Sequence, residues 1–312
     1  MDSSSPVGLV GADERVRKGK EETHGTGLRH DFALVDTTTL LPPLLTFSLL
    51  CLAATLPLAS PTSNPDVALL LTKVKSALQG QRPNVQLATW NASTSLCLWR
   101  GLRWATPDGR PLRCDAASSS RNLSLASDPA LLLVSIRLPA AALASRLPPD
   151  FGAFSALDFV YLAANALTGP VPLELDNAPS LSALNLAGNR LDGDLPTSIW
   201  NLYDRVTKLR LHGNALTGAI PAPPEANTTC DRLRVLDLGA NRFSGGFPVF
   251  LTAFRGLQHL DLGANRLEGP IPEALARMAT QQQLQALNVS YNNFSVQLPP
   301  TFAGSASRRT PS

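Results

Sequence analysis

One leucine pattern recurs seven times between residues 133 and 299, and it constrains the fold of this 312-residue chain more than any other feature. Its clearest copy, residues 157–172, reads L-x-x-V-x-L-x-x-N-x-L-x-G-x-V-P, and successive copies begin 24 to 27 residues apart. In the first copy Ala141 replaces the asparagine and Ser145 the glycine, and in the last copy Val296 replaces the glycine. A period of this length indicates a stack of similar structural units.

Each position of the pattern has a physical role. The leucine–x–leucine alternation predicts a short strand with one side in a core and the other in water. The asparagine is expected to bond backbone groups at the turn, the glycine to allow a close backbone approach, and the proline to end a second extended segment. One unit cannot bury its leucines alone, so the units must stack. The pattern predicts an α/β leucine-rich-repeat solenoid, a curved right-handed superhelix with about seven parallel strands on its concave side and Leu184, Leu211 and Leu260 in its core.

The composition excludes several classes of protein. A content of 44% hydrophobic residues suffices for a core, while a net charge of +3 with 16% charged residues gives no basic patch for nucleic acid. The four cysteines lack the paired spacing of a zinc site. His24 and His30 precede the repeats. His212 and His259 occupy outward strand positions in repeats four and six, and the favoured interpretation is that they are ordinary exposed surface residues. We find no catalytic constellation and no glycine-rich phosphate loop, so the sequence predicts no enzyme, no cofactor and no metal site.

An uncharged apolar segment, Leu40–Leu58, precedes a run of small polar residues. Its length and two adjacent prolines fit the apolar region of a secretory signal better than a membrane span. We predict a signal peptide over residues 37–59, cleaved after Ala53 or near Ala59; a signal anchor retained in the membrane is the alternative. Residues 1–36 are interpreted as a disordered extension, either a real tail or the product of a start codon placed too far upstream.

The segment before the repeats predicts a helix over Asp66–Leu78. Asn64 or Ser63 can cap its start, and Pro65 suits its first turn. Gly80 can end it. The apolar face of this helix consists of Val67, Leu70, Leu71, Val74 and Leu78.

The repeats resemble the plant-specific subclass of extracellular leucine-rich repeats, whose mark is L-x-G-x-[IVL]-P after the asparagine, as at residues 216–221. The segment before them is similar to the N-terminal cap of the same family, whose motif C-x-W-x-G-V-x-C is matched by Cys97, Trp99 and Gly101. The chain thus resembles the ectodomains of plant receptor-like kinases, and in particular that of a receptor-like pseudokinase.

This resemblance implies the organisation of the chain and one disulfide. Trp104 stands where the second cysteine of the cap motif is usual, and Cys114 is the nearest candidate partner for Cys97. The implied parts are an N-terminal cap over residues 60–130, seven plant-type repeats over 131–300 and a disordered tail over 301–312.

A solenoid of this kind is expected to bind on its concave face, where outward strand side chains form an open surface. Aromatic residues and arginine dominate many interfaces. The outward side chains of repeats four to six change from basic to acidic along the chain. The competing interpretation of these charged side chains is that they are solvated and bind no ligand. The candidate binding residues are Arg137, Phe159 and Tyr161, taken as exposed, with Lys208, Arg210, His212, Asp237, His259 and Asp261.

Five asparagines stand in the N-x-Ser/Thr sequence that accepts a glycan in secreted proteins. A glycan on the last repeat would crowd its concave end, which moves the expected binding surface to repeats one to six. The candidate acceptors are Asn91, Asn122, Asn227, Asn288 and Asn293.

Cys230 and Tyr203 occupy equivalent points of adjacent repeats, each three residues before the first apolar residue of its repeat. They are therefore expected to stack. The protein that this chain resembles has cysteine at the position of Tyr203, which implies a lost disulfide between repeats. The remaining thiol is either buried against Tyr203, the preferred interpretation, or available for intermolecular pairing.

These features favour a non-catalytic extracellular recognition module of the receptor-like pseudokinase type, secreted or on the extracellular face of the plasma membrane. The expected partner is a peptide or protein ligand, with a co-receptor ectodomain as a further partner and no nucleic acid. Membrane attachment would require a downstream span or a retained signal. A secreted inhibitor of a cell-wall hydrolase is the alternative, because the same fold serves that function.

Overall fold

The computed structural model describes residues 64–114, 122–225, 229–280 and 284–295, all within one folded unit, Leu56–Ser312. Several predictions from the sequence lie outside the described residues. They are the extension over 1–36, the signal over 37–59, the tail over 301–312 and the glycan acceptor Asn227.

The predicted N-terminal helix is present. Three consecutive segments, α1 (Pro65–Leu69), a π-helical turn (Leu70–Val74) and α2 (Lys75–Gln79), follow one another without a break. The Asn64 side chain accepts a hydrogen bond from the backbone amide of Val67 at 3.0 Å, so Asn64 caps the helix. Val67, Leu70, Val74 and Leu78 of the predicted apolar face are buried, and Leu71 packs against the core half-buried.

The remainder of the cap closes the end of the main sheet. Its elements are α3 (Val85–Ala88), a 3₁₀ turn (Leu96–Leu98), strand β1 (Leu102–Ala105) and a second 3₁₀ segment (Asn122–Ser127). The Cys97–Cys114 disulfide implied by the resemblance is present, with 5.5 Å between the two Cα atoms.

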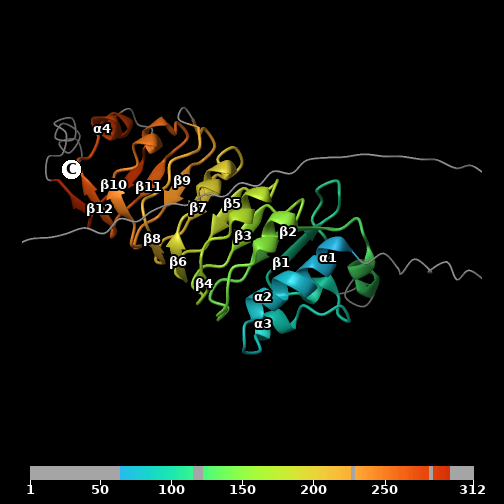
Figure 1. The fold of residues 1–312 in the computed structure, drawn as a ribbon. Coiled ribbons are helices and arrows are strands. Elements are labelled where there is room, and N and C mark those ends of the chain that lie inside the picture. Colours follow the sequence, from blue (N-terminus) through green and yellow to red (C-terminus); the bar gives the residue numbers. More distant parts are fainter. Residues whose placement is uncertain (1–63, 115–121, 226–228, 281–283, 296–312) are drawn as a thin grey trace, which may run out of the picture. The chain divides into compact units, whose positions relative to one another are not determined.

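The repeats build one eight-stranded sheet in the order β1-β2-β3-β5-β7-β9-β11-β13 (Figure 1). The seven repeat strands pair in parallel, as predicted, while β1 adds an antiparallel strand at the N-terminal edge. The repeat strands are β2 (Leu132–Arg137), β3 (Phe159–Tyr161), β5 (Ala183–Asn185), β7 (Lys208–Arg210), β9 (Val235–Asp237), β11 (His259–Asp261) and β13 (Ala286–Asn288).

A second set of short strands follows the repeat asparagines and forms two three-stranded parallel sheets, β4-β6-β8 and β10-β12-β14. The L-x-G glycines of repeats two to six have φ between 71° and 81°, a region that costs glycine no steric strain. These strands are β4 (Thr168–Gly169), β6 (Arg190–Asp194), β8 (Ala215–Thr217), β10 (Ser244–Gly246), β12 (Arg266–Gly269) and β14 (Asn293–Phe294).

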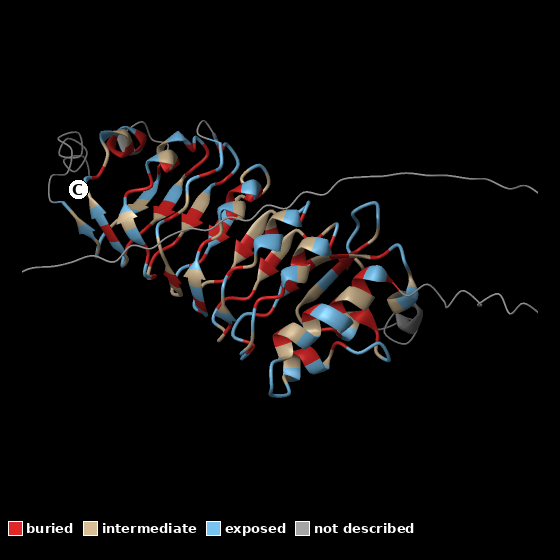
Figure 2. Ribbon diagram, in the orientation of Figure 1, coloured by how far each residue is buried: buried red, intermediate tan, exposed pale blue. Residues whose placement is uncertain are grey.

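Five of the six returns to the main sheet pass through a short helix, and the described residues between β8 and β9 form none. Four of these are 3₁₀ segments, at Pro149–Ala153, Leu173–Asn177, Thr197–Leu202 and Val249–Ala253, and the last is α4 (Glu273–Thr280). The core lies between these segments and the main sheet, and buried residues recur at the same place in successive coils (Figure 2). Leu184, Leu211 and Leu260 are all buried, as predicted.

A ladder of asparagine side chains joins consecutive repeats. Asn241 is typical: its amide group donates to the carbonyls of Leu211, Leu238 and Gly239 at 3.0 to 3.1 Å, and its oxygen accepts from the amide of Leu216 at 3.1 Å. One side chain thereby satisfies backbone groups of two repeats. The same pattern occurs at Asn165, Asn189, Asn214, Asn265 and Asn292.

Cys230 is a buried free thiol. Its sulfur donates to the backbone carbonyl of Tyr203 at 3.3 Å and accepts from the amide of Leu233 at 3.4 Å. The preferred interpretation, burial against Tyr203, is confirmed.

Candidate functional site

The register of the parallel strands arranges the outward side chains of the main sheet in two rows, here called row one and row two. Row one begins with basic and aromatic side chains, has acidic ones on β9 and β11, and ends with an amide. It consists of Arg137, Tyr161, Asn185, Arg210, Asp237, Asp261 and Asn288. Row two consists of Ser135, Phe159, Ala183, Lys208, Val235, His259 and Ala286. Both rows contain predicted binding residues.

The first half of the two rows surrounds a hollow of about 210 Å³ between Arg137 and Arg210. Phe159 and Tyr161 line one side of it and Lys208 lines the other, with the small side chain of Ala183 between them. The Arg137 guanidinium lies over the Phe159 ring, 5.2 Å from its centroid. Phe159 and Tyr161 are half-buried rather than exposed as predicted, because short strands hold neighbouring side chains side by side.

A second open hollow, of about 610 Å³, covers the later repeats. Lys208, Arg210 and Arg234 lie at its basic side, and Asp237 and Asp261 at its acidic side. The predicted change from basic to acidic side chains is therefore a gradient along one continuous surface.

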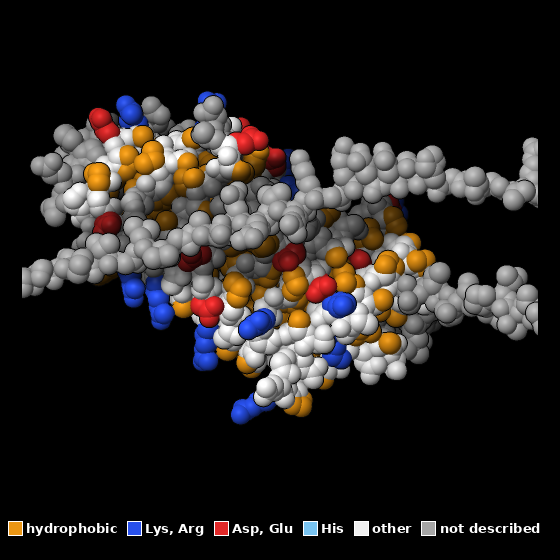
Figure 3. Space-filling view, in the orientation of Figure 1, with side chains coloured by type: hydrophobic (Ala, Val, Ile, Leu, Met, Phe, Trp, Pro, Cys, Tyr) orange, Lys and Arg blue, Asp and Glu red, His pale blue; other side chains and the backbone are white. Residues whose placement is uncertain are grey.

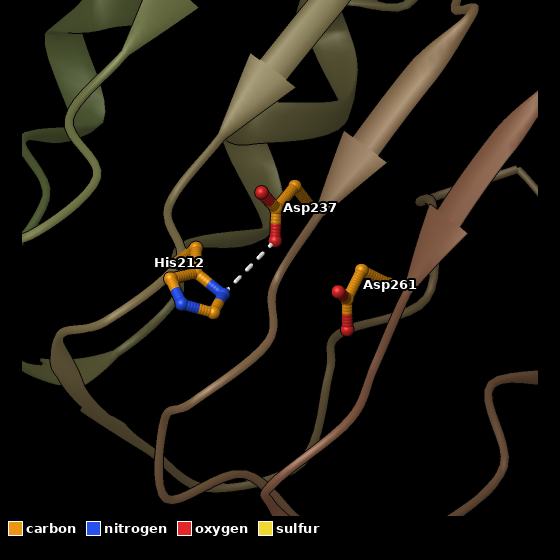
Figure 4. Close-up of side chains that lie close together, drawn as sticks. All are labelled: His212, Asp237 and Asp261. Atoms are coloured by element: carbon orange, nitrogen blue, oxygen red, sulfur yellow. Dashed lines mark ion pairs between the residues drawn. The ribbon is translucent and has the colours of Figure 1, made fainter. Parts of the chain in front are cut away.

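Three predicted residues lie close together, and two of them, Asp237 and Asp261, line this second hollow (Figure 4). One ligand atom from each of His212, Asp237 and Asp261 lies within 4.8 Å of the others. His212 Nδ1 is 3.4 Å from Asp237 Oδ1. His212 does not lie on a strand as predicted: β7 ends at Arg210, and His212 stands two residues farther on, where the backbone leaves the sheet.

The two aspartates are held by different contacts. Asp237 and Asp261 are register partners on β9 and β11. Asp261 accepts hydrogen bonds from the Gly263 amide at 2.8 Å and from the Asn288 side chain at 3.0 and 3.1 Å. Burial raises the pKa of the Asp237 carboxyl above its usual value, and the nearby Asp261 charge adds to this, while His212 and Arg210 act in the opposite direction.

The glycan acceptors differ in their surroundings. Asn91 is exposed, and its side-chain oxygen accepts a bond from the Ser93 amide at 2.9 Å. Asn293 is exposed on β14. The side-chain nitrogen of Asn288, the atom that would carry a glycan, donates a hydrogen bond to the Asp261 carboxylate. Asn122 lies at the start of a 3₁₀ segment. Glycosylation stays a prediction at each of them.

Charged side chains also occur away from the main sheet. Exposed Arg190 and Arg266 lie in β6 and β12 of the second set of strands. In Figure 3 blue side chains project along the lower edge of the view, where Figure 1 labels these strands. Such scattered cations are ordinary solvated positions, and they offer control sites for tests of the two rows.

The comparisons with known proteins agree with this architecture. A family model described as Leucine Rich Repeat matches residues 180–202, 256–278 and 283–305. The repeats form the leucine-rich-repeat solenoid fold that the sequence predicts. This leucine-rich-repeat chain is similar to the kinase-like protein TMKL1 of Arabidopsis thaliana, with 54% identity over 199 residues. The match covers 63% of this chain and 30% of that relative, so the chain spans less than a third of the relative's length. The resemblance inferred from the sequence is confirmed.

One solved structure supports the fold, and a second is also similar. The structure of Pollen Receptor Kinase 3 is similar at 22% identity with a TM-score of 0.51, covering 68% of this chain and 89% of that chain. A TDR receptor structure is 29% identical with a TM-score of 0.47, covering 54% of this chain and 28% of that chain. Among the described residues, no helix has both the length and the apolar character to cross a membrane.

Proposed function

We propose that this leucine-rich-repeat chain is a non-catalytic extracellular recognition module that binds a peptide or a partner ectodomain along rows one and two. The observation that carries the proposal is the continuity of row one, which places aromatic, amide, basic and acidic side chains side by side across seven parallel strands. A ligand lying across the strands contacts each repeat in turn.

The charge gradient suggests the character of the ligand. An acidic or apolar segment would complement the hollow between Arg137 and Arg210, and a basic segment would complement Asp237 and Asp261. The Cys97–Cys114 disulfide supports an oxidising, extracellular location.

A binding screen tests the proposal. The secreted chain is immobilised and exposed to purified plant leucine-rich-repeat receptor ectodomains and synthetic apoplastic peptides, with binding followed by interferometry. We expect a saturable partner whose affinity falls by roughly ten-fold or more in Tyr161→Ala and in Arg210→Ala, since aromatic and arginine anchors dominate interfaces. Arg266→Ala, on β12 in the second set of strands, is the matched control and should bind normally.

A partner that is insensitive to Tyr161→Ala and Arg210→Ala but lost in Arg266→Ala would place binding elsewhere and contradict the proposal. The same variants are assayed against purified cell-wall hydrolases. Inhibition of a hydrolase in the absence of any peptide or ectodomain partner would replace the proposal with the inhibitor alternative.

A further inference from the structure

We propose that His212, Asp237 and Asp261 form a binding site for one divalent transition-metal ion, of the Zn²⁺ class, on the concave face. These residues come from three successive repeats, and their nearest ligand atoms lie within 4.8 Å of one another (Figure 4). Two ligand atoms bonded to one zinc ion at 2.0 to 2.2 Å lie at most about 4.4 Å apart. A closure of about 0.4 Å therefore brings the set to the spacing of zinc ligands.

The backbone around His212 makes room for such an ion. Hydrogen bonds between successive coils place His212 between Ala187 and Gly239: the Gly188 amide donates to the His212 carbonyl at 2.7 Å, and the Gly213 amide donates to the Gly239 carbonyl at 3.0 Å. Equivalent places in the other repeats hold small residues or proline, so the imidazole can extend over its neighbours. They are Pro139, Ala163, Ala187, Gly239, Gly263 and Ser290.

Gly239 is an independent sign that the space above it is shaped for convergence of the ligands. A Cβ atom at this position would lie 2.7 Å from Asp261 Oδ1 and 2.9 Å from His212 Nδ1. Both ligand atoms therefore point to the space that the missing side chain leaves. Gly239 does not have a positive φ, so the glycine is not needed for the backbone conformation.

The chemistry of the three donors fits a borderline cation. One imidazole and two carboxylates suit zinc, cobalt or nickel, whereas calcium and magnesium prefer larger sets of oxygen ligands. Opposed carboxylates such as Asp237 and Asp261 repel one another, and a dication between them removes that repulsion. Asn288 acts as a positioning residue because its amide group holds both oxygens of Asp261.

The test is a calorimetric titration of the full secreted chain, without a polyhistidine tag and after chelator treatment, with ZnCl₂ at pH 7.5. We expect one equivalent to bind, with a rise in melting temperature. Co²⁺ should give visible absorption bands of a protein-bound ion. Affinity should fall at least about ten-fold in His212→Ala and in Asp261→Asn, and about ten-fold in Asn288→Ala.

Two variants keep the outcome decisive. His259→Ala removes the other described histidine, which lies exposed in row two, and should leave the affinity unchanged. Gly239→Ala fills the space between the ligands with one methyl group, at a repeat position where Ala163 and Ala187 show that alanine fits, so it should fold normally and lose zinc. Absence of a zinc equivalent, unchanged affinity in folded His212→Ala or Gly239→Ala, or a preference for Ca²⁺ or Mg²⁺ would overturn the proposal.

Discussion

Replacing Asn241 by alanine should be among the most costly polar substitutions in the middle of the solenoid. The Asn241 side chain makes four hydrogen bonds of 3.0 to 3.1 Å to backbone groups of two repeats, and the residue is only 8% exposed. Each such bond contributes a net 0.5 to 1.5 kcal/mol, and its loss leaves a buried backbone group without a partner. We therefore expect the free energy of unfolding to fall by about 4 kcal/mol, a large part of the 5 to 15 kcal/mol typical of a domain.

The assay is urea unfolding of the purified chain followed by tryptophan fluorescence, because Trp200 is buried against Phe250 and Phe254. With a slope of about 2 kcal/mol per molar urea, the midpoint should fall by roughly 2 M. Asn201→Ala is the matched control: Asn201 is exposed and bonds the Asp176 carboxylate at 2.9 Å, so its loss should cost less than about 0.5 kcal/mol. A cost for Asn241→Ala within 1 kcal/mol of that control would refute the reasoning.

Three further outcomes follow from cysteine and carboxyl chemistry. Tyr203→Cys should form a disulfide bond to Cys230, whose sulfur already lies 3.3 Å from the Tyr203 carbonyl oxygen. The bond should raise the free energy of unfolding by at most about 3.5 kcal/mol, because it restricts the unfolded chain. An unchanged melting temperature with two free thiols would contradict this. Peptide mapping without reduction should recover Cys97 linked to Cys114, and two free thiols in secreted protein would contradict the link. Replacing both cysteines by serine should lower the free energy of unfolding by about 3 kcal/mol. Burial raises the pKa of Asp66, so the folded state binds more protons than the unfolded state as pH rises through 3.8, and stability falls there. Asp66→Asn should therefore gain stability relative to the natural chain as pH increases from 3 to 7 in thermal melts, and a constant difference would contradict the assignment.

The sequence predicted the repeat architecture well because each repeat position has a local physical role. The spacing of leucines sufficed to place Leu184, Leu211 and Leu260 in the core, and the asparagines in the ladder. The cap helix followed from its periodicity and its Asn64 cap. Strand β1 could not be predicted in this way, because it depends on antiparallel pairing with β2 across the intervening 3₁₀ segment.

The candidate site was only partly accessible from the sequence. Counting outward positions gave the charged and aromatic members of rows one and two. It took Phe159 and Tyr161 as exposed because the sequence does not show how closely the short strands hold neighbouring side chains. It also missed the convergence of His212 with the two aspartates. The usable signal was the position of His212 directly after Leu211, where the next repeats have Gly239 and Gly263. Converting that alignment into proximity requires the sheet register.

The antiparallel strand β1 has a consequence for how chains of this kind can change in length during evolution. Each rung of the asparagine ladder contacts its own coil and the preceding one, so a duplicated internal coil would bring its own bonding partners. The first coil is different: it has Ala141 in place of the asparagine, Asn84 of the cap donates to the Ala141 carbonyl at 2.6 Å, and β2 is paired with β1. Gene duplication or deletion is therefore expected to vary coils after the first and to inherit the cap and first coil as one block.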